Sequence, residues 1–126
     1  MNMLMPSIQA SDFSIVTDES AGTPRVKVSG NGDAEMVQPL DDYLVRLHGL
    51  LLANRSPGVV LDLTQLDFMN SSCIKAFASW VHDVKSSSEP YSIQVRLNPD
   101  LPWQTRTFKT LTRLAPSIVQ VEEALI

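Results

Sequence analysis

The chain has 126 residues, which is enough for one domain with its own core and too few for two. Its 44% hydrophobic and 19% charged residues are typical of a soluble globular protein. The net charge of −4, with Lys and Arg scattered along the sequence, argues against nucleic-acid binding. We therefore expect a single domain over residues 1–126, with residues 1–10 as a candidate flexible tail.

The first elements predict a β-hairpin. Apolar and polar residues alternate over Phe13–Ser20 and again over Arg25–Gly30, as expected for two strands with one buried face each. The segment Gly30–Asp33 is rich in residues that tolerate positive φ and is expected to form a turn.

A helix and a central strand follow. From Ala34 to about Asn54 the apolar residues recur at helical spacing. Pro39 is tolerated only in a first turn, so the regular helix is expected to begin near Val37 or Gln38. The nearly continuous apolar run Val59–Leu63 predicts a central strand that is covered on both faces.

Strands and helices alternate through the rest of the chain. Residues 70–87 have helical spacing, Tyr91–Leu97 alternates as a strand, and residues 117–126 add a last short strand. Between them, Asp100 is expected to cap a helix with Pro102 in its first turn. The predicted order is β-β-α-β-α-β-α-β, an α/β (α+β sandwich) fold with helices packed on a mixed sheet of four to five strands.

The sequence also bears on the cellular compartment. A single cysteine, Cys73, excludes an internal disulfide framework and fits a reducing environment. The first residues lack the positive region and the apolar run of a signal peptide, and no stretch approaches the length of a membrane span. We expect a cytoplasmic protein without membrane insertion.

The segment FMNSSCI, residues 68–74, lies where the central strand gives way to the next helix. Asn70 or Ser71 is placed to cap this helix, and capping alone is a sufficient explanation for the paired hydroxyls. Ser72 falls in the first turn, where free amides and the positive end of the helix dipole favour a phosphate. The segment therefore predicts either a purely structural cap or a phosphorylation site at Ser72, with Ser71 as the second choice.

Other reactive side chains carry weaker hypotheses. A thiol near a helix N-terminus can act as a redox sensor, but a small buried apolar role for Cys73 fits better because no histidine is placed to activate it. His48 and His82 lie singly on helices, so no metal site is expected. No glycine-rich phosphate loop or catalytic triad is visible, so we predict no cofactor, no catalytic residue and no enzyme.

The sequence VVLDLTQLDFMNSSCIKAF resembles the signature of STAS domains, the module shared by anti-sigma factor antagonists and sulphate transporters. In that family a buried strand ends in a DSSG motif, and the second serine is phosphorylated. The matching residues are Asp62, Phe68, Ser71, Ser72 and Ile74. The segment VSGNGDAEMVQPL resembles the family's loop beside the phosphoserine, which would place Asp33 there. Asn70 and Cys73 depart from the family's Asp and Gly.

The resemblance implies a bacterial, cytoplasmic, non-catalytic protein of the anti-sigma factor antagonist type. Its partners would be an anti-sigma factor or a histidine-kinase-like serine kinase acting on Ser72, a PP2C-type phosphatase, and as a further candidate a second copy in a homodimer. The partner-binding surface would comprise Asp33, Asn70, Ser71, Cys73 and Ile74. The alternative is a constitutive, unphosphorylated adaptor subunit, for example one docking on a transporter ATPase, which the two departures favour.

Overall fold

The structure is a computed structural model that describes residues 7–10, 12–19 and 22–124. Six strands form one sheet, and three α-helices and a short 3₁₀ helix connect them within this part of the chain. The strands are β1 (Ile8–Ala10), β2 (Phe13–Asp18), β3 (Arg25–Gly32), β4 (Gly58–Met69), β5 (Ser92–Leu97) and β6 (Val119–Glu123). The helices are η1 (Ala34–Met36), α1 (Val37–Ala53), α2 (Ser71–Ser86) and α3 (Pro102–Leu114).

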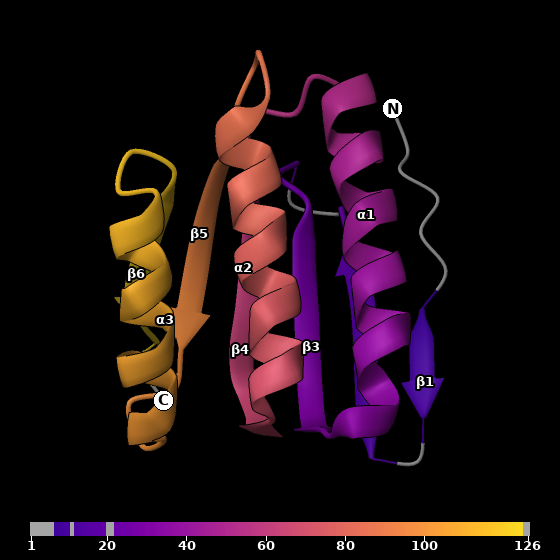
Figure 1. The fold of residues 1–126 in the computed structure, drawn as a ribbon, viewed down its shortest axis with the longest axis vertical. Coiled ribbons are helices and arrows are strands. Elements are labelled where there is room, and N and C mark those ends of the chain that lie inside the picture. The colour runs from indigo at the N-terminus through magenta and orange to yellow at the C-terminus, as the bar shows by residue number, and fades with distance from the viewer. Residues whose placement is uncertain (1–6, 11, 20–21, 125–126) are drawn as a thin grey trace.

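The strands lie in the sheet in the same order as in the sequence, from β1 to β6. Strands β1, β2 and β3 pair antiparallel, whereas β3 to β6 pair in parallel. Crossovers between parallel strands are right-handed, and here each one progresses in the same direction across the sheet. The three helices therefore lie side by side on one face of the sheet (Figure 1).

This arrangement confirms the predicted hairpin, the parallel second half and the order of the elements, with β1 as an additional strand. The sheet has six strands instead of four to five, because Ile8–Ala10, expected in a flexible tail, form β1; residues 1–6 of that tail lie outside the described residues. Three further predictions were wrong. The strand β4 is covered by helices on one face only. The predicted turn at Gly30–Asp33 is mostly strand, because Asn31 and Gly32 still pair with β4. Asp100 does not cap α3, whose N-cap residue Leu101 makes no side-chain cap bond.

Gly30 explains why the second of these predictions failed. Its φ of 92° is the positive value expected of a turn glycine, and a Cβ atom there would lie 2.1 Å from the carbonyl oxygen of Asp12. The residue nevertheless lies in β3, at an irregularity of its pairing with β4. Positive φ is used here for a local bulge within a strand.

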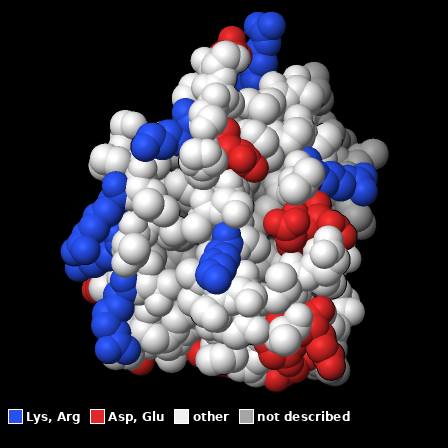
Figure 2. All heavy atoms as spheres, viewed as in Figure 1, with Lys and Arg blue, Asp and Glu red and all other residues white. Residues whose placement is uncertain are grey.

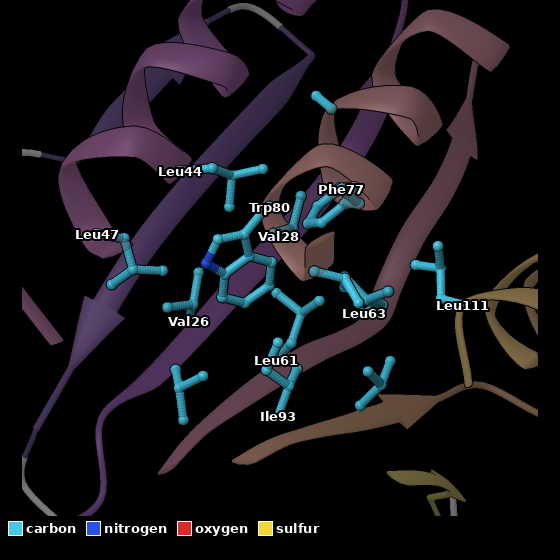
Figure 3. Close-up of a cluster of buried hydrophobic side chains, with 14 of the residues drawn as sticks. Val26, Val28, Leu44, Leu47, Leu61, Leu63, Phe77, Trp80, Ile93 and Leu111 are labelled. Atoms are coloured by element: carbon cyan, nitrogen blue, oxygen red, sulfur yellow. The ribbon is translucent and has the colours of Figure 1, made fainter. Parts of the chain in front are cut away.

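The core lies between the helices and the covered face of the sheet (Figure 3). Side chains from every layer meet there, and all of those labelled in the figure are buried: Val26, Val28, Leu44, Leu47, Leu61, Leu63, Phe77, Trp80, Ile93 and Leu111. Burying one such side chain stabilises the fold by roughly 1.5–3 kcal/mol. None of the helices in the described ranges is long and apolar enough to cross a membrane.

A hydrogen-bonded network of aromatic side chains joins α1, α2 and β5 at the edge of this core. The buried Tyr91 oxygen accepts from Trp80 Nε1 at 2.9 Å and lies 2.8 Å from His48 Nδ1. Since the indole can only donate, the Tyr91 hydroxyl is free to donate its own proton to His48. Burial raises the pKa of the Tyr91 hydroxyl, so it stays protonated in this role.

Strand β4 extends well past its neighbour β5. The last pair between them is Asp62 with Arg96, whereas β4 remains paired with β3 as far as Met69. Two register shifts occur on this extension, because β4 advances by one residue more than β3 on two occasions. They change the spacing of the buried side chains, and Leu63, Leu66 and Met69 all face the core.

Side chains from the segment between β5 and α3 take the place of β5 beside the end of β4, where β5 no longer pairs with it. Gln104 is fully buried, and its Nε2 donates to the carbonyl oxygens of Leu63 at 2.7 Å and Leu66 at 2.8 Å. Its Oε1 accepts from the amide of Asn98. Asn98 Nδ2 donates to the Thr64 carbonyl and Trp103 Nε1 to the Asp67 carbonyl. The carbonyl groups that β5 leaves unpaired are thus satisfied by side chains.

We expect Gln104→Met to lower the free energy of unfolding by more than about 3 kcal/mol. The change keeps the length of the side chain but leaves three buried backbone groups without partners, each worth about 1–3 kcal/mol. Urea denaturation measures the loss. The matched control is Gln94→Met on the exposed side of β5, expected to stay within about 0.5 kcal/mol of wild type. Equal effects of the two changes would contradict this role of Gln104.

Candidate functional site

The site residues predicted from the sequence meet at the carboxyl ends of β3 and β4. Gly32 pairs with Met69 at the end of both strands, and the Asn70 amide donates to the Gly32 carbonyl at 2.8 Å. The Cys73 thiol lies 3.5 Å from the carbonyl oxygen of Asp33, to which it donates. Residues 33–35 and 70–74, distant in sequence, therefore form one local surface at the start of η1 and of α2.

Asn70 is the N-cap residue of α2. Its backbone is extended, and its side-chain oxygen accepts from the Cys73 amide at 2.9 Å, which satisfies one of the free donors of the first turn. Asp33 caps η1 in the same way, by accepting from the Glu35 amide. Of the two caps expected from the sequence, Asn70 or Ser71, it is Asn70 that makes the capping bond.

The two serines are consequently free of a structural role in capping. Ser71 and Ser72 are the first two residues of α2, and both are exposed. Amides at these positions have no partner within the helix, and the helix dipole is positive there. Two hydroxyl groups are thus presented on a rigid scaffold, next to the exposed Asp33 and Glu35 and the half-buried Ile74.

Cys73 lies on the opposite side of this turn from the serines. Its side chain is fully buried. Burial raises the pKa of the Cys73 thiol, and the negative charge of Asp33 raises it further. A raised pKa reduces the amount of thiolate at neutral pH, which together with the burial argues against the redox-sensor hypothesis. The buried sulfur also removes Cys73 from the set of side chains that a partner could contact.

Asp62, the carboxylate matched in the predicted family motif, is away from this surface. It lies in the part of β4 that pairs with β5, and its carboxylate accepts from the amide and the hydroxyl of Thr64 at 3.0 and 2.7 Å. Arg25 lies 3.9 Å from its second oxygen. Asp62 therefore stabilises β4 where its irregular pairing begins, as a buried carboxylate with local partners.

One exposed side chain near the serines was missed as a site residue. Phe68, two residues before the cap, is 51% exposed although it lies in β4. The sequence matched Phe68 to the STAS motif, but it could not predict the exposure. The exposure follows from the register shift between Leu66 and Phe68, where β4 has one residue more than β3. Among the residues that the structure describes, no group of three or more His, Cys, Asp or Glu side chains could hold a metal ion.

Comparison with solved structures identifies proteins of the same fold. An anti-sigma factor antagonist from Mycobacterium paratuberculosis superimposes with a TM-score of 0.61 and 22% identity, over 86% of this chain and 88% of that chain. SiaC, the activator of the diguanylate cyclase SiaD from Pseudomonas aeruginosa, superimposes with a TM-score of 0.67 and 16% identity, over 94% of this chain and 99% of that chain. At the level of the fold, these likenesses confirm the resemblance seen in the sequence.

No protein-family model and no curated protein matches the sequence.

We expect Asn70→Ala to lower the free energy of unfolding by about 1 kcal/mol, because the Cys73 amide loses its cap. Asn70→Asp keeps an acceptor oxygen and should preserve the stability. Ser71→Ala is the matched control and should change it by less than about 0.5 kcal/mol. Thermal and urea denaturation of the three variants measure these differences. If Ser71→Ala were the costly change, the capping role of Asn70 would be refuted.

We expect the native Cys73 thiol to resist alkylation at pH 8. Its raised pKa and full burial both reduce the concentration of reactive thiolate, so iodoacetamide should react at least about tenfold more slowly than with the urea-unfolded chain. Intact-mass measurements over time give both rates. The native rate should increase as the pH rises toward the folded-state pKa. Rapid native alkylation at neutral pH would restore the redox-sensor hypothesis.

Proposed function

We propose that this chain, which has a STAS-like fold, is a non-catalytic regulatory protein of the cytoplasm that binds a protein partner and releases it on phosphorylation of Ser72. The observation that carries the proposal is the position of Ser72. It is an exposed serine in the first turn of a helix whose cap is supplied by a different residue, Asn70. Modification of Ser72 can therefore change the surface without removing a bond that holds the helix.

The physical basis of the switch is the charge of the phosphate. A phosphoserine carries close to two negative charges at neutral pH and binds water strongly. At the start of α2 it gains from the free amides and the helix dipole, so the domain stays folded. A partner packed against Ser71, Ser72 and Ile74 would have to strip water from the phosphate, which weakens the complex.

The neighbours in structure support a function through protein partners. One is named as an anti-sigma factor antagonist, and the other as the activator of an enzyme, SiaD. By analogy, we propose an anti-sigma factor or a histidine-kinase-like serine kinase as the partner of this chain, with a PP2C-type phosphatase to reverse the modification. Asp33, Asn70, Ser71 and Ile74 would surround the contact. A homodimer remains a further proposal.

The second candidate function is a constitutive adaptor that is never phosphorylated, for instance a subunit docked on a transporter ATPase. The departures at Asn70 and Cys73 favour it. Asn70 removes the carboxylate that the family presents beside the serine, and the side chain of Cys73 fills a position that is glycine in the family. Both changes preserve the helix start and alter what a kinase would recognise.

Intact-mass spectrometry with peptide mapping on protein from its native cell separates the two candidates. We expect a fraction of the chains to be heavier by about 80 Da, the mass added by one phosphate, and peptide mapping should place the modification on Ser72. The samples should cover growth and stress conditions. A wholly unmodified population under all of them would favour the constitutive adaptor.

We expect Ser72→Glu to reduce the amount of partner that copurifies with the tagged chain by roughly tenfold or more, about 1.4 kcal/mol in binding. The reason is the added charge in the contact. Ser72→Ala should retain the partner and lose any phosphate-dependent release. Ser79→Glu, an equally exposed serine further along α2, is the matched control and should have no effect. Loss of partner in both Glu variants would indicate a general charge effect.

A further inference from the structure

The register shift in β4 leaves the Phe68 side chain half exposed instead of buried in the core. Its ring is 51% exposed at the end of β4, next to the buried Met69 and the cap Asn70. Most of the chain's other aromatic side chains are buried in the core, including Phe13, Phe77, Trp80, Tyr91 and Phe108. A half-exposed phenylalanine beside the candidate site is therefore unusual for this chain. Aromatic side chains in such positions are often the residues that contribute most to binding a protein partner.

The surface around Phe68 is acidic. The exposed carboxylates at this edge of the sheet are Asp33, Glu35, Asp67 and Asp100, together with Asp12 in the β1–β2 connection. Within residues 33–35, 67–75 and 98–100, Lys75 is the one basic side chain. No ion pair within the described part of the chain neutralises these carboxylates. In Figure 2, Asp and Glu gather at the lower right, below α1, and others lie on the middle of the helical face.

The distribution of charge differs on the other side of the helical layer. Helix α3 carries Arg106, Lys109 and Arg113, all exposed, and no Asp or Glu. Lys and Arg accordingly lie over α3 at the left of Figure 2. The edge that holds Phe68 is thus acidic whereas the surface of α3 is basic, and a partner can distinguish these two sides of the molecule by charge.

We propose that Phe68 is the apolar anchor of the partner-binding surface, and that the partner is a protein whose contact region places Lys and Arg side chains around an apolar pocket. The inference rests on the proposed partner-binding function and extends it to the chemistry of the partner. The acidic edge attracts the basic surface over a long range, and burial of the Phe68 ring holds the complex at short range. Residues Ser71 and Ser72 then lie at the margin of the same contact.

The test is site-specific photo-crosslinking in the native cell. Phe68 is replaced by p-benzoylphenylalanine, which keeps an aromatic ring in place. A second chain carries the same amino acid at Val45 of α1, the matched control, which is 64% exposed and apolar but lies on a different surface. We expect a protein partner to crosslink at position 68 and not at 45, through a partner peptide of net positive charge. No crosslink at 68, equal crosslinks at both positions, or an acidic partner peptide would overturn the proposal.

Alanine substitution at positions 68 and 45 gives an independent measure of how much each side chain contributes to partner binding. Phe68→Ala should weaken partner binding at least tenfold, whereas Val45→Ala should leave it unchanged. Both variants should keep a melting temperature close to that of the wild type, because Val45 is mostly exposed and the Phe68 side chain is only half buried. Glu35→Lys should mainly slow association, and this effect should diminish as NaCl is raised because salt screens exposed charges. Tight binding by Phe68→Ala would exclude the anchor role.

These outcomes are separable from those of the proposed switch. If Ser72 is never phosphorylated but position 68 crosslinks to a basic surface, the docking surface stands and the switch fails. If Ser72 is phosphorylated but position 68 yields no crosslink, the switch stands and the anchor fails.

Discussion

The structure depends on how the unpaired edge of β4 is satisfied. A strand that outlasts its neighbour leaves carbonyl groups that must find donors once they are buried. In this protein the donors are side chains of Gln104, Asn98 and Trp103, which come from the loop after β5 and the first turn of α3. They bond to carbonyl groups at both register shifts. Four carbonyl groups at the irregular end of β4 are thereby bonded, and this end leads directly into the candidate site.

The same extension positions the candidate site. Met69 and Cys73 are buried on either side of Asn70, and Asn70 is bonded both to β3 and to the first turn of α2. These bonds fix the backbone, so the exposed Ser71 and Ser72 need no conformational change to be reached by another protein. Asn70 holds the start of the helix, whereas the neighbouring Ser71 and Ser72 are exposed. A change of charge on a serine can therefore act on a partner without acting on the fold.

The two structural neighbours have the same fold, but they are named for different targets, an anti-sigma factor and a diguanylate cyclase. A shared fold places the helix N-terminus and the strand ends, whereas the choice of partner rests on exposed side chains around them. In this chain the exposed side chains around the start of α2 include two serines, a phenylalanine and a group of carboxylates. A partner would use the charge and the shape of this edge to distinguish this protein from others of the same fold.

The sequence by itself determined the helices, the hairpin and the parallel order of the later strands. These follow from hydrophobic periodicity and from chain connectivity, which are local properties. It also located the serines at a helix start, because Asn and Ser in that pattern favour a helix N-terminus. It favoured a buried Cys73 as well, which the structure confirms. Only the tertiary structure decided that Asn70 and not Ser71 caps the helix, that Phe68 is exposed and that Gly30–Gly32 continues a strand. The exposure of Phe68 and the course of Gly30–Gly32 depend on the register between β3 and β4, and such pairing leaves no periodic signal in a single segment.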